Sequence, residues 1–243
     1  MRGTIPLGAA AGIKASAHWS LIVFLIGLFG VLLWQGADLL LALRSLLLTG
    51  LLFFCVLCHE FGHAVAAQAF GVRTLDVTLY PVGGIARLES MPSVPRQELV
   101  IAAAGPLVNL LLAMGFFVWS LVNGYNPGSS ISVQSPLPVS LLWLNLALAA
   151  FNLLPVFPMD GGRVLRALLA MRMSYQMATR VTVWTAQVLA VGFAVIAIVP
   201  VPLFRSFNPV LLFIAIFVFF AARQEGNQNP RPPVRNVSDT PVD

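Results

Sequence analysis

Long apolar runs separated by short polar segments dominate this sequence of 243 residues. A helix needs about 20 mostly apolar residues to cross the hydrocarbon core of a bilayer. Six runs are candidates for such spans, the fourth and the sixth being short: residues 18–34, 45–70, 99–122, 137–154, 178–199 and 209–222. The pattern predicts an all-α polytopic membrane protein with one transmembrane core over residues 1–222. The polar residues 223–243 are predicted to form a disordered tail.

The composition excludes other classes of protein. Charged residues make up 9% of the chain and hydrophobic residues 58%, whereas an average soluble domain has about 25% charged residues. Such a chain can neither cover a water-facing surface nor stay disordered in water. The net charge of +5 could suggest a nucleic-acid partner, but the arginines are scattered through short loops. We therefore expect no nucleic acid and read the charges as signals of membrane orientation.

The basic residues predict which ends of the spans face the cytoplasm. With six spans and a cytoplasmic N-terminus, twelve of the 14 basic residues fall in inside segments. Only Arg44 and Arg205 fall outside. Short cytoplasmic loops are enriched in Lys and Arg. We therefore expect a multi-pass protein in a lipid bilayer with its N- and C-termini in the cytoplasm.

Two segments between the spans have patterns of their own. Residues 72–89 are rich in β-branched and aromatic residues and are interrupted at residues 81–84, which predicts a small membrane-associated β hairpin or sheet between the second and third spans. Residues 164–173 carry a helical pattern after Gly161-Gly162. We predict a short helix at the membrane surface there, with Arg163 and Arg166 as interfacial anchors, the alternative being a role in substrate binding.

The second span contains ionisable residues that are costly to bury in lipid, so they are candidates for function. The window His59-Glu60-Phe61-Gly62-His63 places two imidazoles four residues apart, on one face of a helix. H-E-x-x-H on a helix is the arrangement of zinc hydrolases. Glu60 would activate a zinc-bound water by taking its proton and would later protonate the leaving amine. The alternative is a polar helix–helix contact in which Glu60 pairs with a histidine.

Two histidines do not complete a catalytic zinc site, which needs a third protein ligand. Asp160 is the candidate. Pro155 and Pro158 break the fourth helix before it, and Gly161-Gly162 allow an unusual turn after it. Broken backbone at membrane depth is tolerated only where protein or a polar cavity covers it, as the wall of a site would. The alternative for Asp160 alone is the N-cap of the following helix.

These residues resemble the site-2 proteases, the intramembrane zinc metalloproteases, in their compact branch with archaeal members and the sporulation protease. Four elements carry the resemblance in the right order between about residues 45 and 170. They are His59-Glu60-Phe61-Gly62-His63, the hairpin Tyr80-Pro81-Val82-Gly83-Gly84-Ile85-Ala86, Gly105-Pro106-Leu107-Val108-Asn109, and Asn152 with Pro155 and Pro158-Met159-Asp160-Gly161-Gly162.

The resemblance implies roles for particular residues. His59, His63 and Asp160 would hold one Zn²⁺ per chain, and Glu60 would be the catalytic acid and base. Asn152 would lie beside the metal and hold substrate or the oxyanion, a donor where negative charge develops. Asn109 would line the site from the third span, although an asparagine in an apolar helix is more often a contact between helices.

The resemblance also implies substrates and a location. The family cleaves transmembrane segments of membrane-bound regulators, such as anti-sigma factors, pro-sigma factors and membrane-tethered transcription factors, and this branch points to a prokaryotic cell membrane. The Gly83-Gly84 hairpin could offer an unpaired strand edge to an unwound substrate. Many members of the branch carry a pair of CBS modules after the last span. We expect no such pair, and no inserted PDZ domain, within these 243 residues.

Two other classes of protein compete with this reading. Cys55-Val56-Leu57-Cys58-His59 matches the C-x-x-C-H pattern of haem c attachment, which would indicate electron transfer. The cysteines lie deep in an apolar run, however, whereas haem c needs an exposed site. Intramembrane histidines and acids also mark ion pathways, so a metal transporter is the second alternative. A transporter would have no need of Glu60 beside the histidine pair.

Overall fold

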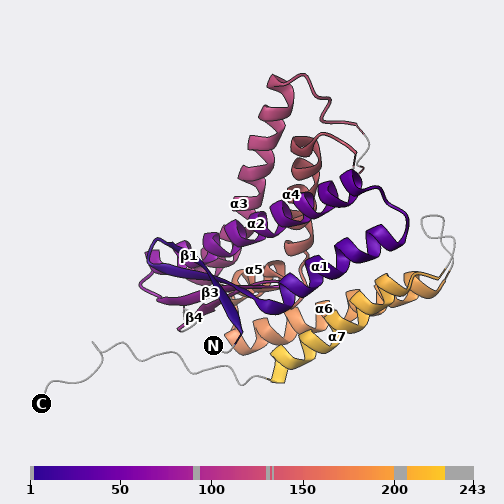
Figure 1. Cartoon of the computed structure of the whole chain (residues 1–243). Coiled ribbons are helices and arrows are strands. Elements are labelled where there is room, and N and C mark those ends of the chain that lie inside the picture. The colour runs from indigo at the N-terminus through magenta and orange to yellow at the C-terminus, as the bar shows by residue number, and fades with distance from the viewer. Residues whose placement is uncertain (1–2, 90–93, 130–131, 133, 200–206, 228–243) are drawn as a thin grey trace, which may run out of the picture. The chain divides into compact units, whose positions relative to one another are not determined.

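The computed structural model describes the chain except for residues 1–2, 90–93, 130–131, 133, 200–206 and 228–243. Its described part is mostly helical, with seven helices and one four-stranded mixed sheet (Figure 1). The chain falls into two compact units. Residues 1–91 and 100–152 form the first unit, and residues 92–99 and 153–243 form the second. Each unit is described by itself.

The helices of the first unit include a long one that carries the predicted histidine pair. They are α1 (Trp19–Trp34), α2 (Leu39–Ala69), α3 (Pro95–Val122), whose residues from 100 onward belong here, and α4 (Leu137–Asn152). The side chain of Asp38 caps α2 by accepting a hydrogen bond of 2.7 Å from the backbone N–H of Leu41. At the other end Gly71 takes a positive φ of 74°. The N–H groups of Gly71 and Val72 donate to the carbonyls of Gln68 and Ala67, which makes a Schellman end.

The sheet of the first unit packs against the C-terminal half of α2. Its strands are β1 (Thr4–Ala10), β2 (Ile13–His18), β3 (Thr74–Tyr80) and β4 (Gly83–Leu88), in the order β1-β2-β3-β4. β2 and β3 run parallel and the other pairs antiparallel. Ile13 and Val77 are buried against Ala64 of α2, with Leu57 and Phe61 beside them. The sheet therefore supports the turns of α2 that carry the histidines.

The predicted hairpin is confirmed as β3 and β4, but the expectation of an otherwise all-α chain is wrong. β1 and β2 are two further strands, in a part of the chain before the first predicted span where no strand was predicted. They are joined at Ala11-Gly12, both with positive φ, as in the tight hairpin turns that match the twist of strands. Alternate residues of β2 are buried, among them Ala15 and Ala17. This alternation was the available signal, although the residues were too small to give a clear hydrophobic pattern.

The second unit is built from α5 (Asp160–Ala170), α6 (Tyr175–Ile198) and α7 (Pro209–Asn227). The segment before α5 is docked on the two long helices. Val156, Phe157 and Met159 form one buried cluster with residues of α6 and α7, namely Ala186, Ala190, Val218 and Ala222. The proline-broken segment is thus a packed part of this unit, and it leads directly into Asp160.

A buried ion-pair network joins the helices of the second unit. Arg166 of α5 is 5% exposed and donates to Glu98 Oε1 at 2.9 and 2.5 Å. It also donates to Glu225 Oε1 of α7 at 2.6 Å. Its guanidinium lies over the rings of Phe157 and Tyr175, 5.0 and 5.1 Å from their centroids. Its prediction as an interfacial anchor is therefore wrong, because its charge is paired inside the protein.

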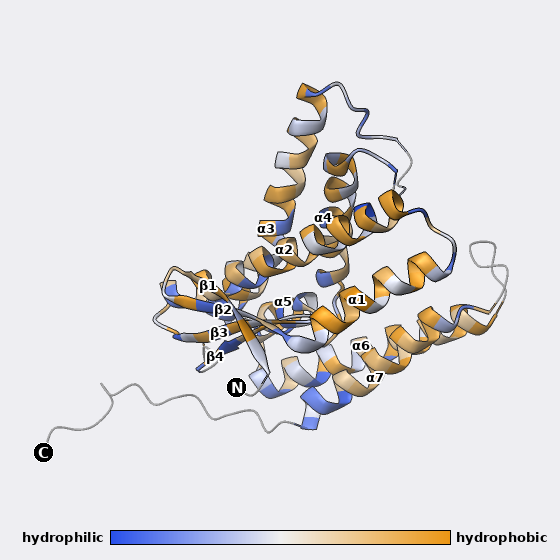
Figure 2. Cartoon of the chain, viewed as in Figure 1, coloured by the Kyte–Doolittle hydropathy of each residue, from blue (hydrophilic) through white to orange (hydrophobic). Residues whose placement is uncertain are grey.

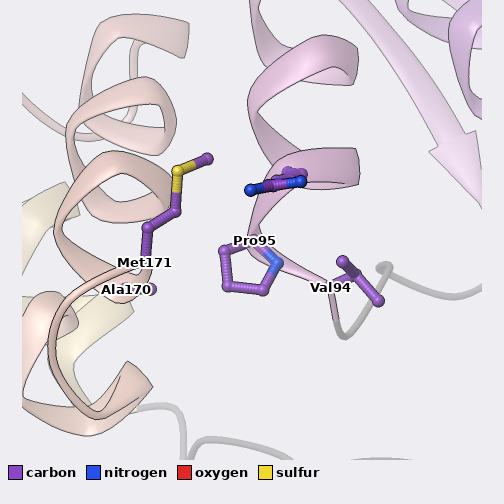
Figure 3. Close-up of a pocket in the computed structure, with 5 residues that line it drawn as sticks. Val94, Pro95, Ala170 and Met171 are labelled. Atoms are coloured by element: carbon purple, nitrogen blue, oxygen red, sulfur yellow. The ribbon is translucent and has the colours of Figure 1, made fainter.

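An open pocket of about 320 Å³ lies in the same unit, between the start of α3 and the end of α5 (Figure 3). Its lining includes Pro95, Ala170 and Met171 and none of the predicted site residues. We assign no function to it.

The predicted spans correspond to apolar helices of the described residues. α2, α3, α6 and α7 are long and apolar enough to cross a membrane, and α1 and α4 are shorter apolar helices. Figure 2 shows hydrophobic residues along most of these helices. The short helix predicted over residues 164–173 is α5, which begins four residues earlier, at Asp160. α7 continues through residues 223–227, and the rest of the predicted tail lies outside the described residues. The chain is a multi-pass membrane protein.

Candidate metal centre

The histidine pair lies in the last three turns of α2. With a rise of 1.5 Å per residue, this helix of 31 residues is about 46 Å long, and His59 lies about 30 Å along the axis from Leu39. The hydrocarbon core of a bilayer is about 30 Å thick. The helix is therefore long enough to cross it, and the pair lies toward the end of the helix that leads into the sheet.

The two imidazoles turn the same ring nitrogen toward each other. His59 is 5% exposed and His63 9%, and their Nε2 atoms are 3.1 Å apart. The Nδ1 atom of His63 lies 2.7 Å from the carbonyl oxygen of Ile101 in α3. Because a carbonyl oxygen can only accept, Nδ1 is the protonated nitrogen of neutral His63 and Nε2 carries the lone pair. This is the tautomer of a histidine that ligates a metal through Nε2.

A glycine of α3 lies directly against the two nitrogens, where no other residue would fit. A Cβ atom on Gly105 would lie 2.7 Å from His59 Nε2 and would overlap His63 Nε2. Gly62 allows α2 and α3 to approach closely, since its Cβ atom would lie 2.9 Å from the carbonyl oxygen of Ala104. Two imidazole nitrogens that face each other at a position where only glycine fits are suited to hold a metal ion.

We expect Gly105→Ala to weaken zinc binding by about 10- to 100-fold, the range found when the surroundings of metal ligands are disturbed. The added methyl group would push both imidazoles out of place. Gly115→Ala on the same helix is the matched control, because nothing lies within 4 Å of its added Cβ atom. Zinc affinity is measured by competition with a chelating dye. Equal zinc affinities of the two variants would show that the space at Gly105 is not needed for metal binding.

Glu60, the residue after His59 on α2, lies against strand β4 of the sheet. A Cβ atom on Gly84 would lie 3.1 Å from Glu60 Oε1, so only glycine leaves room for this carboxylate beside β4. β4 is an edge strand of the sheet, and Gly83, with a φ of 138°, begins it. The structure thus brings Glu60 close to Gly84 of the predicted hairpin, which is 24 residues away in the sequence.

The predicted asparagines differ in their surroundings. Asn109 of α3 is fully buried, and its Oδ1 atom lies 2.5 Å from Nδ1 of His59. It therefore contacts a predicted ligand from behind, and it joins helices, as the alternative for this residue expected. Asn152 is the last residue of α4 and is half-buried, and its side-chain amide donates to the carbonyl of Leu148. Among the described residues of its unit, Asn152 makes no hydrogen bond to His59 or His63.

Asp160 belongs to the second unit, where it is the first residue of α5. The N-cap of α5 is Met159, whose side chain makes no capping hydrogen bond, so the alternative of Asp160 as the N-cap is wrong. A carboxylate in the first turn is stabilised in its ionised form by the helix dipole, and this is the form that binds metals. Gly161 and Gly162 do not have positive φ. A side chain at either position would instead collide with the backbone of residues 153–157. The prediction of an unusual turn is therefore wrong, and the glycines are needed for close packing.

Asn145 and Cys55 were not predicted as parts of the site. Asn145 of α4 is fully buried and accepts a hydrogen bond of 2.9 Å from the side-chain amide of Asn109. Its own amide donates to Cys55 Sγ at 3.3 Å. The only sequence signal for Asn145 was a polar amide in the middle of an apolar run. Such a residue is usually a contact between helices. Cys55 is 2% exposed, and its thiol accepts a hydrogen bond in the helix bundle, which argues against haem attachment.

Comparisons with known proteins identify relatives of this chain. Residues 47–137 and 128–199 match the sequence profile of peptidase family M50. A zinc metalloprotease of Methanocaldococcus jannaschii is 33% identical over 230 residues, which cover 93% of this chain and 61% of that protein. Stage IV sporulation protein FB of Bacillus subtilis is 31% identical over 175 residues, 71% of this chain and 58% of that protein. The chain thus spans less than two thirds of the length of these relatives.

A solved structure is also similar to this chain. The site-2 protease from Methanocaldococcus jannaschii superposes with a TM-score of 0.63 at 30% sequence identity. The match covers 96% of this chain and all of that one. The similarity therefore extends over most of the chain.

Proposed function

Since the chain belongs to peptidase family M50, the site-2 protease family of zinc metalloproteases, we propose that it hydrolyses peptide bonds within or near transmembrane segments of other membrane proteins. The observation that carries the proposal is the convergence of the two Nε2 atoms, 3.1 Å apart, at a glycine. His59, His63 and Asp160 would hold one Zn²⁺, because together they supply two imidazoles and a carboxylate. When bound, zinc polarises the scissile carbonyl and acidifies the attacking water.

Glu60 is proposed to move the proton. It follows the first histidine directly, and its carboxylate lies beside the edge strand β4. A carboxylate there can accept a proton from water and then give it to the nitrogen of the leaving amine. Glu60 is not needed as a metal ligand in this scheme. Its removal should therefore separate catalysis from metal binding.

Substrate binding is proposed to use the edge of β4. A transmembrane helix hides its peptide bonds, so it must unwind before it can be cleaved. An extended segment can then add a strand to an exposed sheet edge through main-chain hydrogen bonds. Gly83 and Gly84 begin that edge strand, and Gly84 lies next to Glu60, which would place a paired substrate beside the acid and base. The side-chain amide of Asn152 is proposed to donate to the oxyanion that develops on the cleaved carbonyl.

The proposed substrates are membrane-bound regulators, such as anti-sigma factors, pro-sigma factors and membrane-tethered transcription factors. The support is the resemblance of the site elements to the family. The excess of basic residues in the predicted inside segments supports an orientation with both termini in the cytoplasm, and the branch of the family that the chain resembles supports a prokaryotic cell membrane. On that orientation the histidine end of α2 lies toward the cytoplasm.

Removal of the metal tests the proposal directly. We expect a chelator of transition metals to lower the cleavage rate of a single-span membrane substrate by at least about 100-fold, since zinc contributes several kcal/mol to catalysis. Added Zn²⁺ should restore the rate, and Mg²⁺ should not. The protein is assayed in lipid vesicles, with its metal content measured in every sample. Undiminished cleavage by protein verified to be free of metal would refute the proposal.

A further inference from the structure

A hydrogen-bonded chain of three buried side chains runs behind the metal centre. It begins at Asn145 of α4, passes through Asn109 of α3 and ends at His59 of α2. The amide of Asn109 donates to Asn145 Oδ1 at 2.9 Å, and Asn109 Oδ1 lies 2.5 Å from His59 Nδ1. Both asparagines are 0% exposed. All three residues belong to the first unit.

The direction of this chain is set at its far end. The side chain of Asn145 lies 2.8 Å from the backbone carbonyl oxygen of Leu141, an atom that can only accept. The group of Asn145 that faces it must therefore be the NH₂ group. Its second N–H donates to Cys55 Sγ. Both donors are thus used, and the oxygen of the amide is the group turned toward Asn109.

The rest of the chain follows from that orientation. An amide oxygen accepts, so Asn109 must present its NH₂ group to Asn145 and its own oxygen to His59. That oxygen also accepts, so Nδ1 of His59 must donate. A neutral imidazole protonated on Nδ1 carries its lone pair on Nε2, the atom that faces His63 Nε2 at 3.1 Å.

We propose that Asn145 is a positioning residue that acts through Asn109 to hold His59 in the tautomer able to bind a metal through Nε2. This inference rests on the proposed metal site. His63 reaches the same tautomer through a backbone carbonyl, that of Ile101, which no substitution removes. At His59 the partner of Nδ1 is instead a side chain, that of Asn109. Without Asn145 the amide of Asn109 can turn over and present NH₂ to His59, which then needs its proton on Nε2, where it blocks the metal.

The first test compares zinc affinities in a double-mutant cycle. We expect Asn145→Leu to weaken zinc binding about 10-fold, the lower end of the range for residues that orient metal ligands. In the background of Asn109→Leu the same substitution should have no further effect, because the path to His59 is already cut. Ser140→Ala in α4 is the matched control. It also removes a buried polar group from this helix, and Ser140 Oγ has no hydrogen-bond partner among the described residues.

The second test reads the tautomer itself in metal-free protein. The chain has only three histidines, so labelling with ¹⁵N-histidine gives few ring signals, and His59→Gln identifies those of His59. We expect Nδ1–H in the wild type and a measurable Nε2–H population in Asn145→Leu. Nε2–H at His59 in the wild type would overturn the inference even if the variant failed to fold. Equal zinc affinities of Asn145→Leu and Ser140→Ala would also overturn it. A wild type that binds no zinc would refute the proposed function instead.

Discussion

Glu60→Gln should lower the rate of peptide cleavage by about 1,000-fold and leave bound zinc unchanged. Positioned acids and bases contribute about 10²- to 10⁴-fold to such reactions. Glutamine has nearly the same size and fits beside Gly84, but its amide cannot take a proton from water. The rate is measured on a single-span membrane substrate in vesicles, and zinc is measured on the same samples by mass spectrometry.

Glu89→Gln is the control for this substitution, because Glu89 is an exposed carboxylate just after β4. It should cleave at the wild-type rate. Full cleavage by Glu60→Gln would contradict the role given to Glu60, and loss of zinc from it would make Glu60 a ligand. If the protein were a metal transporter, the wild type, Glu60→Gln and Glu89→Gln would all bind zinc and none of them would cleave the substrate.

The features that depend on neighbours in the sequence could be predicted. The spacing of His59 and His63 brings their rings together on any helix, and the apolar run around them made the helix certain. The interruption at residues 81–84 marked the turn between β3 and β4 in the same way. In each case the local structure depends on a few residues that are close together in the sequence.

The features that depend on distant partners could not be predicted from pattern alone. β2 pairs in parallel with β3, so that Lys14 lies opposite Asp76, and no local signal reports a partner some 60 residues away. Arg166 resembled any arginine at a membrane surface until its partners Glu98 and Glu225 were known. The role proposed for Asn145 likewise depends on its hydrogen bond to Asn109, which the sequence does not reveal. Buried polar networks are defined by all of their members at once.

The Gly-Pro element of α3 shows how a motif gains a physical reason from the structure. In the sequence, Gly105 supported only a resemblance to a family. In the structure it is the position at which a methyl group would strike both imidazoles. Gly84 and Gly62 have comparable roles, beside Glu60 and between α2 and α3. Each of these glycines marks a place where the site requires space rather than an unusual backbone angle.

The central claim is that a carboxylate from α5 completes a zinc site begun by two histidines of α2. The most direct measurement is zinc content with X-ray absorption at the zinc edge, on the wild type and on Asp160→Asn. Asp76→Asn is the control, since Asp76 pairs with Arg87 in the sheet, away from the histidines in the sequence.

We predict one zinc per chain in the wild type and in Asp76→Asn. The spectrum should show two imidazole nitrogens at about 2.0 Å and a carboxylate oxygen at about 2.0–2.2 Å. Asp160→Asn should lose the carboxylate signal and bind zinc at least about 10-fold more weakly. An Asp160→Asn protein with the stoichiometry, affinity and spectrum of the wild type would contradict the claim.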